Sequence, residues 1–551
     1  MLGTIRQSFR DERGNTSVLF ALSVIPMALA AGTAIDYGRA AALRSKLQAV
    51  TDSVTLSLCK LPATTTTAEM QKTALASMQS YFPTNTITLD PLQVTTNPRQ
   101  VTLASRTNYP TLVVRIGKID NIPLGTMATC SAQETFFEIA LVLDNTGSMN
   151  SSSGSQSKLD ALKKAATKFT DYMFTNGSMP GKLKVSLVPF SAAVAVDPVT
   201  FRNASWIDQA GKSKYHWDNI VAANASGFNN RFDVFAKLKG KFASWDWAGC
   251  LESLPYPQNV EDGAPSSGNK DSYYVPMLAP DEAGTGGSIL SASGSSSPNS
   301  YIDDGFSTRR RAACNTAGSD SQNMGQACKY TNPANATRTN TAGDSRIGPN
   351  WMCRTQPLTR LSTDRNAVES KINAMVGDGN TNIHEGFSWG WRTLSPLSVF
   401  ADGAPYSDLK TKKVVVLMTD GMNTWGVNSA NTVTKSSYSA YGYVNNVTGT
   451  GPNGRLSSAA QISATSPSEG QARAAMDRLT REACANARNA GIIVFTVGFS
   501  VPTDPIDAQG LKLLSDCAGS AERSFVATND QDLIDKFQLI AQGIGNLRLT
   551  R

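Results

Sequence analysis

From Phe136 onward the sequence alternates between short, continuous apolar runs and longer amphipathic segments, and this alternation constrains the fold more than any other feature. The runs FFEIALVLD at Phe136 and KVVVLMTD at Lys413 lack the polar alternation of a half-exposed strand, so they predict strands buried on both faces. Helices between such strands imply a doubly wound α/β fold with a mostly parallel sheet. Further strands are expected at 183–191 and 491–499, and helices at 158–174, 364–375, 383–394, 471–490, 507–516 and 530–545.

Near the N-terminus, residues 16–35 (TSVLFALSVIPMALAAGTAI) carry no charge. A helix of about 20 residues spans roughly the 30 Å hydrocarbon core of a bilayer, and Pro26 is tolerated better in a membrane helix than in a soluble one. The flanking basic residues are nearly balanced and do not set the orientation. All eight cysteines follow the segment, which favours an oxidising compartment for the bulk of the chain. We expect a single-pass anchor after a cytoplasmic tail (1–15); a secretory signal cleaved after Ala30 is the alternative.

The rest of the chain divides by composition and periodicity. Apolar residues at helical spacing between Leu43 and Val54 predict an amphipathic helix at 36–60, which continues from the membrane segment or bends away from it. Residues 61–135 show strand-like alternation broken by Asn-Pro and Tyr-Pro turns, which predicts a small α+β unit. The α/β domain then occupies 136–551, with insertions rich in small and polar residues at about 195–354 and 422–467.

Hydroxyl residues and carboxylates follow the expected strands where those strands end. Asp144 closes the first buried strand, and Thr146 and Ser148 follow at alternate positions, so their side chains can converge above the strand tip. Thr381 lies in a Gly/Asn-rich turn before a helix, and Asp420 directly follows a second strand. Parallel sheets bind ligands at the carboxyl ends of their strands, so we expect these five side chains to meet. Such oxygen donors suit Mg²⁺, with Mn²⁺ or Ca²⁺ as alternatives, and a partner's acidic side chain could complete the shell.

Several function classes are not indicated. The net charge of +7 is small for 551 residues and the basic residues are dispersed, so no nucleic-acid partner is predicted. No Cys-x-x-Cys pair suggests zinc or redox chemistry, and no phosphate-binding Gly-rich loop follows a strand. Only His216 and His384 could serve a Ser-His-Asp triad, and His384 is placed to cap the helix that follows it. We therefore expect no enzyme; a metal-dependent hydrolase using Asp420 as a base is the least favoured alternative.

The segments LVLDNTGSM, GNTNIHEG and VLMTDG, in this order within an α/β frame, resemble the metal-ion-dependent adhesion site (MIDAS) of von Willebrand factor A (vWA) domains. The family pattern is Asp-x-Ser-x-Ser, then a Thr, then an Asp. Thr146 replaces the first Ser and keeps the hydroxyl. The resemblance implies that Thr146, Ser148 and Thr381 contact the ion directly and that Asp144 and Asp420 act directly or through water.

A second resemblance covers nearly the whole chain. The N-terminal run DERGNTSVLFALSVIPMALAAGTAIDYGRAAALRSKLQAVTDS resembles TadE/TadG-type proteins of the Tad (tight adherence, Flp pilus) system, and WAGCLES and PLTRLSTDRNAVESKI resemble TadG-like proteins with a C-terminal vWA domain. The chain lacks the Glu that pilins place shortly after a processing Gly, because Asn15 to Leu19 follow Gly14. The resemblance implies a Gram-negative inner-membrane protein whose bulk projects into the periplasm.

Together, these features predict a pilus-assembly or pilus-anchoring protein that uses a metal site to bind other envelope or pilus proteins. A secreted or surface-exposed vWA adhesin that uses the same site on an external ligand is the alternative. In the assumed fold, Cys484 and Cys517 lie on adjacent helices and are expected to pair. Three further pairs are then hypothesised from proximity among the many possible connectivities: Cys250 with Cys353, Cys314 with Cys328, and Cys59 with Cys130.

Overall fold

The computed structural model divides into two compact units, Met1–Glu134 (unit 1) and Thr135–Arg551 (unit 2). The division falls one residue before the position expected from the sequence. Most of the expected cytoplasmic tail, parts of the first insertion and most of the second insertion lie outside the described residues. The structure describes residues 12–61, 65–96, 99–132, 135–175, 182–282, 299–302, 314, 325–333, 348–426, 434–444, 455 and 468–546.

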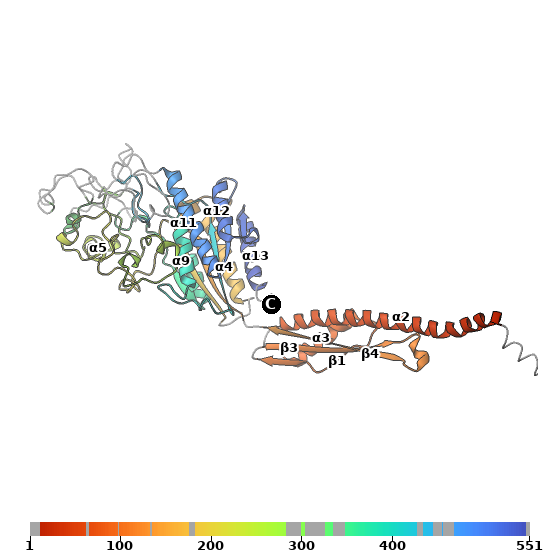
Figure 1. The fold of residues 1–551 in the computed structure, drawn as a ribbon. Helices are drawn as coiled ribbons and strands as arrows, with labels where there is room; N and C mark the ends of the chain where they lie inside the picture. Colours follow the sequence, from red (N-terminus) through yellow and green to blue (C-terminus); the bar gives the residue numbers. More distant parts are fainter. Residues whose placement is uncertain are drawn as a thin grey trace, which may run out of the picture. The chain divides into compact units, whose positions relative to one another are not determined.

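Unit 1 consists of a long helix, a short helix and an antiparallel sheet (Figure 1). Strands β3 and β4 form a hairpin whose turn contains the short 3₁₀ helix η1. Strands β1 and β2 pair with the other edge of β3. The elements are α2 (Glu12–Cys59), α3 (Thr67–Tyr81), β1 (Thr88–Leu89), β2 (Gln93–Thr96), β3 (Arg99–Pro110), η1 (Val114–Gly117) and β4 (Asn121–Ala132).

Helix α2 joins the expected membrane segment and the expected amphipathic helix in one continuous element. Its second half buries Leu47, Val54 and Leu58 against α3 and the sheet. In its first half large apolar side chains such as Leu22 and Ile25 are exposed. Helix α2 is long and apolar enough to cross a membrane by length and composition. The two segments expected from the sequence are therefore the two halves of one helix.

The sheet of unit 2 has six strands in the order β10-β9-β8-β5-β6-β7. All neighbouring pairs are parallel except β6 with β7. The structure confirms a mixed α/β fold with a mostly parallel sheet. The short antiparallel edge strand β7 was not expected, because its sequence TRLS has no apolar run. The strands are β5 (Phe136–Asp144), β6 (Leu183–Phe190), β7 (Thr359–Ser362), β8 (Thr411–Thr419), β9 (Ile493–Phe499) and β10 (Ser524–Ala527).

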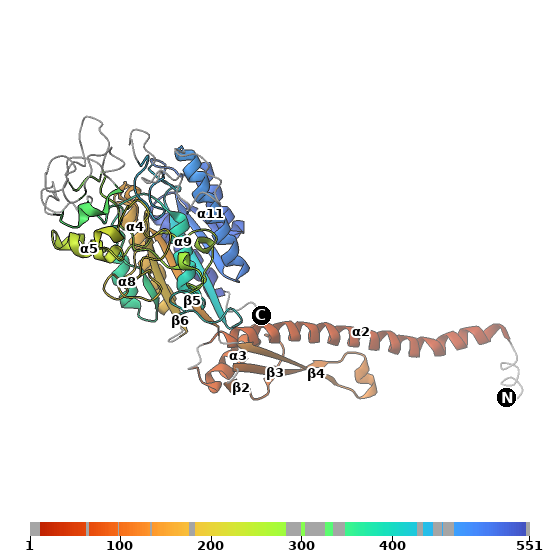
Figure 2. The same cartoon turned by 60° about the vertical axis from the view of Figure 1, so that its left-hand side comes forward.

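Helices cover both faces of this sheet (Figures 1 and 2). Ile139 and Leu141 of β5 face a core with three of the helices, whereas Ala140 and Val142 face a second core with three others. Burial on both faces explains why the strands are continuously apolar. The first core contains α4 (Lys158–Thr175), α8 (Arg365–Asn373) and α13 (Asp530–Asn546); the second contains α9 (Ile383–Leu394), α11 (Glu469–Asn489) and α12 (Ala508–Ala518).

The described part of the first insertion packs into the second of these cores rather than only decorating a ligand face. It contains helix α5 (Arg231–Lys239), and its Trp247 and Leu251 are buried in the same cluster as Phe387 of α9. The Gly/Ser-rich segment expected on its surface lies mostly outside the described residues. The described part of this insertion therefore belongs to the folded body of unit 2.

The structure contains the four disulfides expected from the sequence: Cys59–Cys130, Cys250–Cys353, Cys314–Cys328 and Cys484–Cys517. The last joins α11 to α12 across a sequence separation of 33 residues. Replacing both Cys484 and Cys517 by Ser should lower the free energy of unfolding of unit 2 by roughly 3 kcal/mol, because the unfolded chain gains freedom. Urea unfolding of the full chain measures the loss. Peptide mapping without reductant checks the pair itself, and free thiols at these positions would contradict it.

Candidate metal centre

Strands β5 and β8 bring the two predicted carboxylates together at their carboxyl ends. The strands are parallel neighbours, with Leu143 opposite Met418. Asp144 is the last residue of β5, and Asp420 follows the last residue of β8. Both side chains are buried. The register of the two strands therefore places the carboxylates side by side at the point where the strand order reverses, which is where sheets of this kind bind ligands.

Hydrogen bonds connect four of the five predicted residues. Asp144 accepts a bond from the backbone N–H of Thr146 (2.8 Å). The hydroxyls of Thr146 and Ser148 are 3.0 Å apart, and Ser148 Oγ donates to Asp420 Oδ1 (2.8 Å). The other oxygen of Asp144 accepts a bond from Thr419 Oγ1 (2.6 Å), a contact not foreseen from the sequence.

Thr381 lies beside this chain of contacts. It precedes Asn382, whose side chain caps the N-terminus of α9. The backbone N–H of Thr381 donates to Thr424 Oγ1 (2.9 Å), and Thr424 N–H donates back to the Thr381 carbonyl (2.9 Å). A Cβ atom built on Gly421 would lie 4.0 Å from Thr381 Oγ1, so the hydroxyl is close to the backbone that follows Asp420.

A second contact holds the Thr381 turn against the β5 loop. Gly147 N–H donates to the carbonyl of Gly379 (3.0 Å). Gly379 has a φ of 83°, in the region that favours glycine, so the turn needs a glycine at this position. The three distant segments therefore meet at the carboxyl ends of β5 and β8. We call Asp144, Thr146, Ser148, Thr381 and Asp420 the oxygen cluster.

The electrostatics of the oxygen cluster are unfavourable without a cation. Burial raises the pKa of Asp144 to about 7, the nearby Asp420 adds to this, and the hydrogen bonds from Thr146 and Thr419 oppose it. Two carboxylates share a dry site, and like charges in such a site resist joint ionisation. A bound cation would relieve that repulsion.

One protein cation already lies at the oxygen cluster. The buried Lys158 Nζ donates to Asp420 Oδ2 (2.9 Å) and to Asp504 Oδ2 (2.7 Å). Burial lowers the pKa of Lys158, but the hydrogen bonds and charges of Asp504 and Asp420 outweigh it and hold the pKa above its ordinary value. Sequence reasoning missed this residue. Its position could have indicated a special role, because Lys158 is the first residue of α4, where the helix dipole disfavours a cation.

The donor chemistry of the oxygen cluster fits a hard divalent cation. Its side chains offer two carboxylates and three hydroxyls, which suit Mg²⁺ or Ca²⁺ better than softer metals. Among the residues that the structure describes, no group of three or more His, Cys, Asp or Glu side chains could hold a metal. The negative charge of the cluster thus comes from Asp144 and Asp420 alone, and Lys158 offsets part of it.

Lys158 should compete with a bound cation for Asp420. Replacing Lys158 by Met removes a positive charge next to the cluster, so the affinity for Mg²⁺ should rise by about tenfold, or ~1.4 kcal/mol. The metal-free protein should lose stability, because Asp420 remains buried without its partner. Calorimetric titration and thermal unfolding measure the two effects. Lys168→Met, at an exposed position of the same helix, is the matched control; weaker Mg²⁺ binding in Lys158→Met would show that the lysine supports the metal.

Neither histidine contacts the oxygen cluster through a hydrogen bond of its ring. His384 shares a hydrogen bond of 2.7 Å with Tyr441 Oη and one of 3.0 Å with the Asn259 carbonyl. Burial lowers its pKa to about 3. The sequence suggested that His384 caps its helix, but Asn382 makes the cap and His384 instead contacts residues of the two insertions.

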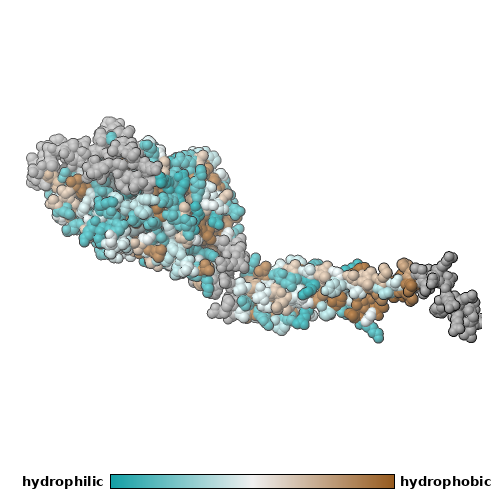
Figure 3. All heavy atoms as spheres, in the orientation of Figure 1, coloured by the Kyte–Doolittle hydropathy of each residue, from teal (hydrophilic) through white to brown (hydrophobic). Residues whose placement is uncertain are grey.

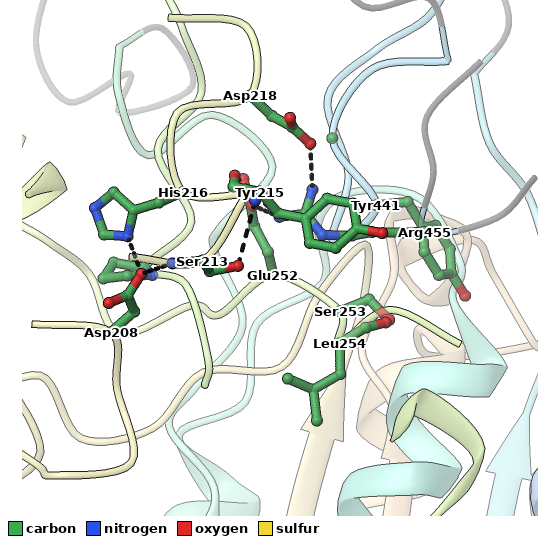
Figure 4. A network of polar contacts seen from close by, with 12 residues as sticks. Asp208, Ser213, Tyr215, His216, Asp218, Glu252, Ser253, Leu254, Tyr441 and Arg455 are labelled. Carbon is green, nitrogen blue, oxygen red and sulfur yellow. Dashed lines mark hydrogen bonds and ion pairs between the residues drawn. The ribbon is translucent and has the colours of Figure 1, made fainter. Parts of the chain in front are cut away.

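His216 belongs to a buried polar network in the insertions (Figure 4). Its Nδ1 lies 2.9 Å from Asp208 Oδ2, and its Nε2 accepts the backbone N–H of Arg231 (2.9 Å). Both ring nitrogens are thus engaged. Nearby, Glu252 binds both Arg231 (2.5 Å) and Arg455, which joins the two insertions. This network stabilises the packing of the insertions and leaves His216 no nitrogen for a serine nucleophile.

Comparison with protein families gives a match at the N-terminal helix. Residues 14–57, all within α2, match the family described as Flp pilus-assembly TadE/G-like. This segment is much less than half of the chain. Comparison with curated proteins gives no match.

Among solved structures, the chain matches several proteins of pili at low similarity. The pilus adhesin SpaC of Lactobacillus rhamnosus GG has 12% identity and a TM-score of 0.32, covering 84% of this chain and 34% of SpaC. The PilB minor pilin of Streptococcus sanguinis has 12% identity and a TM-score of 0.31, covering 84% and 78%. The vWF domain of the type V pili tip protein Mfa5 of Porphyromonas gingivalis has 11% identity and a TM-score of 0.32, covering 76% and 97%. The chain thus spans about a third of the length of SpaC. Because the TM-scores are low, the description of the fold given above rests on the strand order and register of this chain and not on these similarities.

Proposed function

We propose that this chain is a Tad/Flp pilus-assembly or pilus-anchoring protein of the inner membrane, with unit 2 a vWA domain that binds a periplasmic partner through a MIDAS-type metal site. One observation carries the proposal: Asp144, Thr146, Ser148 and Asp420, from two distant segments, are linked by a chain of hydrogen bonds at the carboxyl ends of β5 and β8, where the strand order reverses. Thr381 lies beside them from a third segment. A chain selected only for stability has little reason to bury two neighbouring carboxylates there.

The placement in the envelope has independent support. The family match covers residues 14–57, and α2 is long and apolar enough to span a bilayer. Four disulfides follow that segment, and disulfides persist in oxidising compartments such as the bacterial periplasm.

In this proposal the oxygen cluster binds rather than catalyses. Thr146, Ser148 and Thr381 supply hydroxyl oxygens, and Asp144 and Asp420 supply charge, directly or through water. Thr419 orients Asp144 through its hydrogen bond of 2.6 Å. A bound Mg²⁺, or alternatively Mn²⁺ or Ca²⁺, would supply an electrophilic position that an acidic side chain of an envelope or pilus protein could occupy.

Affinity capture from solubilised envelopes of the host cell tests the function. The full-length chain should retain pilus or envelope proteins in Mg²⁺ and release them in EDTA. The Asp144→Asn variant should retain none in either buffer, whereas Asp535→Asn, an exposed carboxylate of unit 2, should behave like the unmodified chain. Retention that is equal with and without metal, or equal in Asp144→Asn, would contradict a metal-bridged contact.

Two other functions make different predictions. A released or surface-exposed adhesin would begin after Ala30, so N-terminal sequencing of the mature chain separates it from an anchored protein with an intact Met1. A hydrolase would turn over a substrate and lose that activity in Asp420→Ala. We favour binding because Asp420, the base that such a hydrolase would use, already accepts hydrogen bonds from Ser148 and Lys158, and both histidines have their ring nitrogens engaged elsewhere.

A further inference from the structure

The turn between β3 and β4, residues 111–120, exposes apolar side chains at one end of unit 1. We call this segment the hairpin tip. Leu112 is 64% exposed, Ile116 74% and Ile119 51%. Three large aliphatic side chains in a single turn form an apolar surface that water solvates poorly, and such surfaces mark contact sites.

The hairpin tip is held against α2 by a buried carboxylate. Asp36 accepts hydrogen bonds from the backbone N–H groups of Leu112 (3.1 Å), Val113 (2.8 Å) and Val114 (3.0 Å). One turn earlier on α2, a Cβ atom at Gly32 would lie 2.3 Å from Val113 Cγ1, so only glycine permits this close approach. The tip is therefore fixed at the level of residues 32–36 of α2.

This level is where the apolar half of α2 ends. Residues 16–35 carry no charge, and Asp36 is the first charged residue after them. Leu22, Ile25 and Ile35 are exposed in this half, and the exposed Tyr37 follows, an aromatic residue typical of a membrane interface. Figure 3 shows apolar residues gathered along this end of unit 1. A helix that crosses a bilayer with residues 16–35 would place the hairpin tip at the membrane surface.

The charges of the hairpin tip suit an anionic lipid surface. Arg115 and Lys118 are exposed, and Asp120, the one acidic residue of the tip, lies 3.1 Å from Arg115. Long basic side chains can place their charge among phospholipid headgroups while nearby aliphatic side chains enter the apolar region.

We propose that the hairpin tip is a second membrane contact of unit 1. Leu112, Ile116 and Ile119 enter the interface of the bilayer that α2 crosses, and Arg115 and Lys118 contact anionic phospholipid headgroups. The inference depends on the proposed anchor but adds to it, because a helix alone leaves unit 1 free to rotate about the helix axis. A second contact fixed through Asp36 removes that freedom and orients the sheet of unit 1 relative to the membrane.

Site-specific fluorescence on the full-length chain tests the contact. The eight native cysteines are all in disulfides, so Ile116→Cys offers one free thiol for an environment-sensitive dye. The protein is reconstituted into vesicles of phosphatidylcholine and phosphatidylglycerol. Lipids brominated on the acyl chains report contact with the bilayer, and iodide reports contact with water.

Two further labelled variants provide controls. Met127→Cys labels a similarly exposed apolar position of the same hairpin, since Met127 is 64% exposed and Ile116 74%. The Met127 carbonyl accepts a hydrogen bond from Gln48, which lies 12 residues beyond Asp36 and thus about 18 Å along α2. Ile25→Cys labels the proposed membrane segment itself. We expect brominated lipid to quench the Ile25 and Ile116 dyes at least about threefold more than the Met127 dye, and iodide to show the reverse order.

Each other result overturns a specific statement. If the Ile25 dye is quenched by brominated lipid but the Ile116 dye is as open to iodide as the Met127 dye, the tip proposal fails and the anchor stands. If the Ile25 dye is not quenched by brominated lipid, both fail. If the Ile116 dye is protected from both quenchers, protein covers the tip instead of lipid. Arg115→Gln with Lys118→Gln should weaken quenching at Ile116 only in vesicles that contain phosphatidylglycerol, and unchanged quenching there would remove the role of charge.

Discussion

Replacing Asp144 by Asn should lower the affinity for Mg²⁺ by about 100-fold or more, because affinity for such ions depends on ligand charge, and should leave the metal-free protein at least as stable as before. The substitution keeps the shape of the side chain. Its amide oxygen can still accept the N–H of Thr146, and its NH₂ group can donate to the Thr419 hydroxyl, which can accept as well as donate. The variant removes a charge that the metal-free site disfavours.

Calorimetric titration of the full chain with Mg²⁺ measures the affinity, and thermal unfolding without metal measures the stability. The Asp535→Asn variant controls for the general loss of a carboxylate from unit 2. Equal binding heats for Asp144→Asn and the unmodified protein would leave the oxygen cluster without a role in metal binding. A large loss of metal-free stability would instead assign Asp144 a structural role.

The metal-free protein should lose stability as the pH rises from about 4 to about 7 because of Asp144. Burial and the neighbouring Asp420 raise its pKa in the folded state to about 7, from an ordinary value of 3.8. Between these values the folded state binds more protons than the unfolded state, so raising the pH favours unfolding. The loss amounts to about 1.4 kcal/mol per pH unit and at most about 4 kcal/mol over the window. Mg²⁺ should abolish the loss by binding the ionised form.

Other buried groups titrate in the same range, so the measurement is a difference. Burial raises the pKa of Glu282 to about 8, which adds to the loss of stability with rising pH. Burial lowers the pKa of His384 to about 3, from an ordinary value of 6.5, and between these two pH values this shift opposes the loss. Thermal unfolding across this pH range should therefore compare the unmodified protein with Asp144→Asn, each with and without Mg²⁺. The slopes should differ only without metal. Identical slopes in the metal-free proteins would show that Asp144 does not titrate as described.

The elements of the fold were largely predictable because their signals are local. The expected helix 383–394 is α9, Ile383–Leu394, and the expected helix 530–545 is α13, Asp530–Asn546. Strands β7 and β10 were both missed, because an edge strand of four residues is too short to give a long apolar run. The division between membrane segment and amphipathic helix also had no local signal, since no helix-breaking sequence separates the two halves of α2.

The oxygen cluster was predictable in its members but not in its surroundings. The sequence indicates three members, Asp144, Thr146 and Ser148, because they alternate along one loop. It indicates Asp420 because this residue directly follows a buried strand. Lys158 and Asp504 were not foreseen, because the contacts of Lys158 with Asp420 and Asp504 depend on how α4 and the turn after β9 pack over the carboxyl ends of the strands. The hydrogen bonds between the hairpin tip and Asp36 likewise join residues that are 76 or more positions apart in the sequence, so no local pattern predicts them.

By itself, the sequence determined the four long strands and six helices of the α/β domain, which residues can offer oxygen to a cation, and which 20-residue stretch can enter a membrane, since these follow from side-chain chemistry and period. Tertiary structure alone decided that Lys158 neutralises Asp420, that the insertions bind both histidines, and that the hairpin tip reaches the end of the apolar half of α2. These contacts join distant parts of the chain, and their geometry is set by strand register and helix packing rather than by any local pattern.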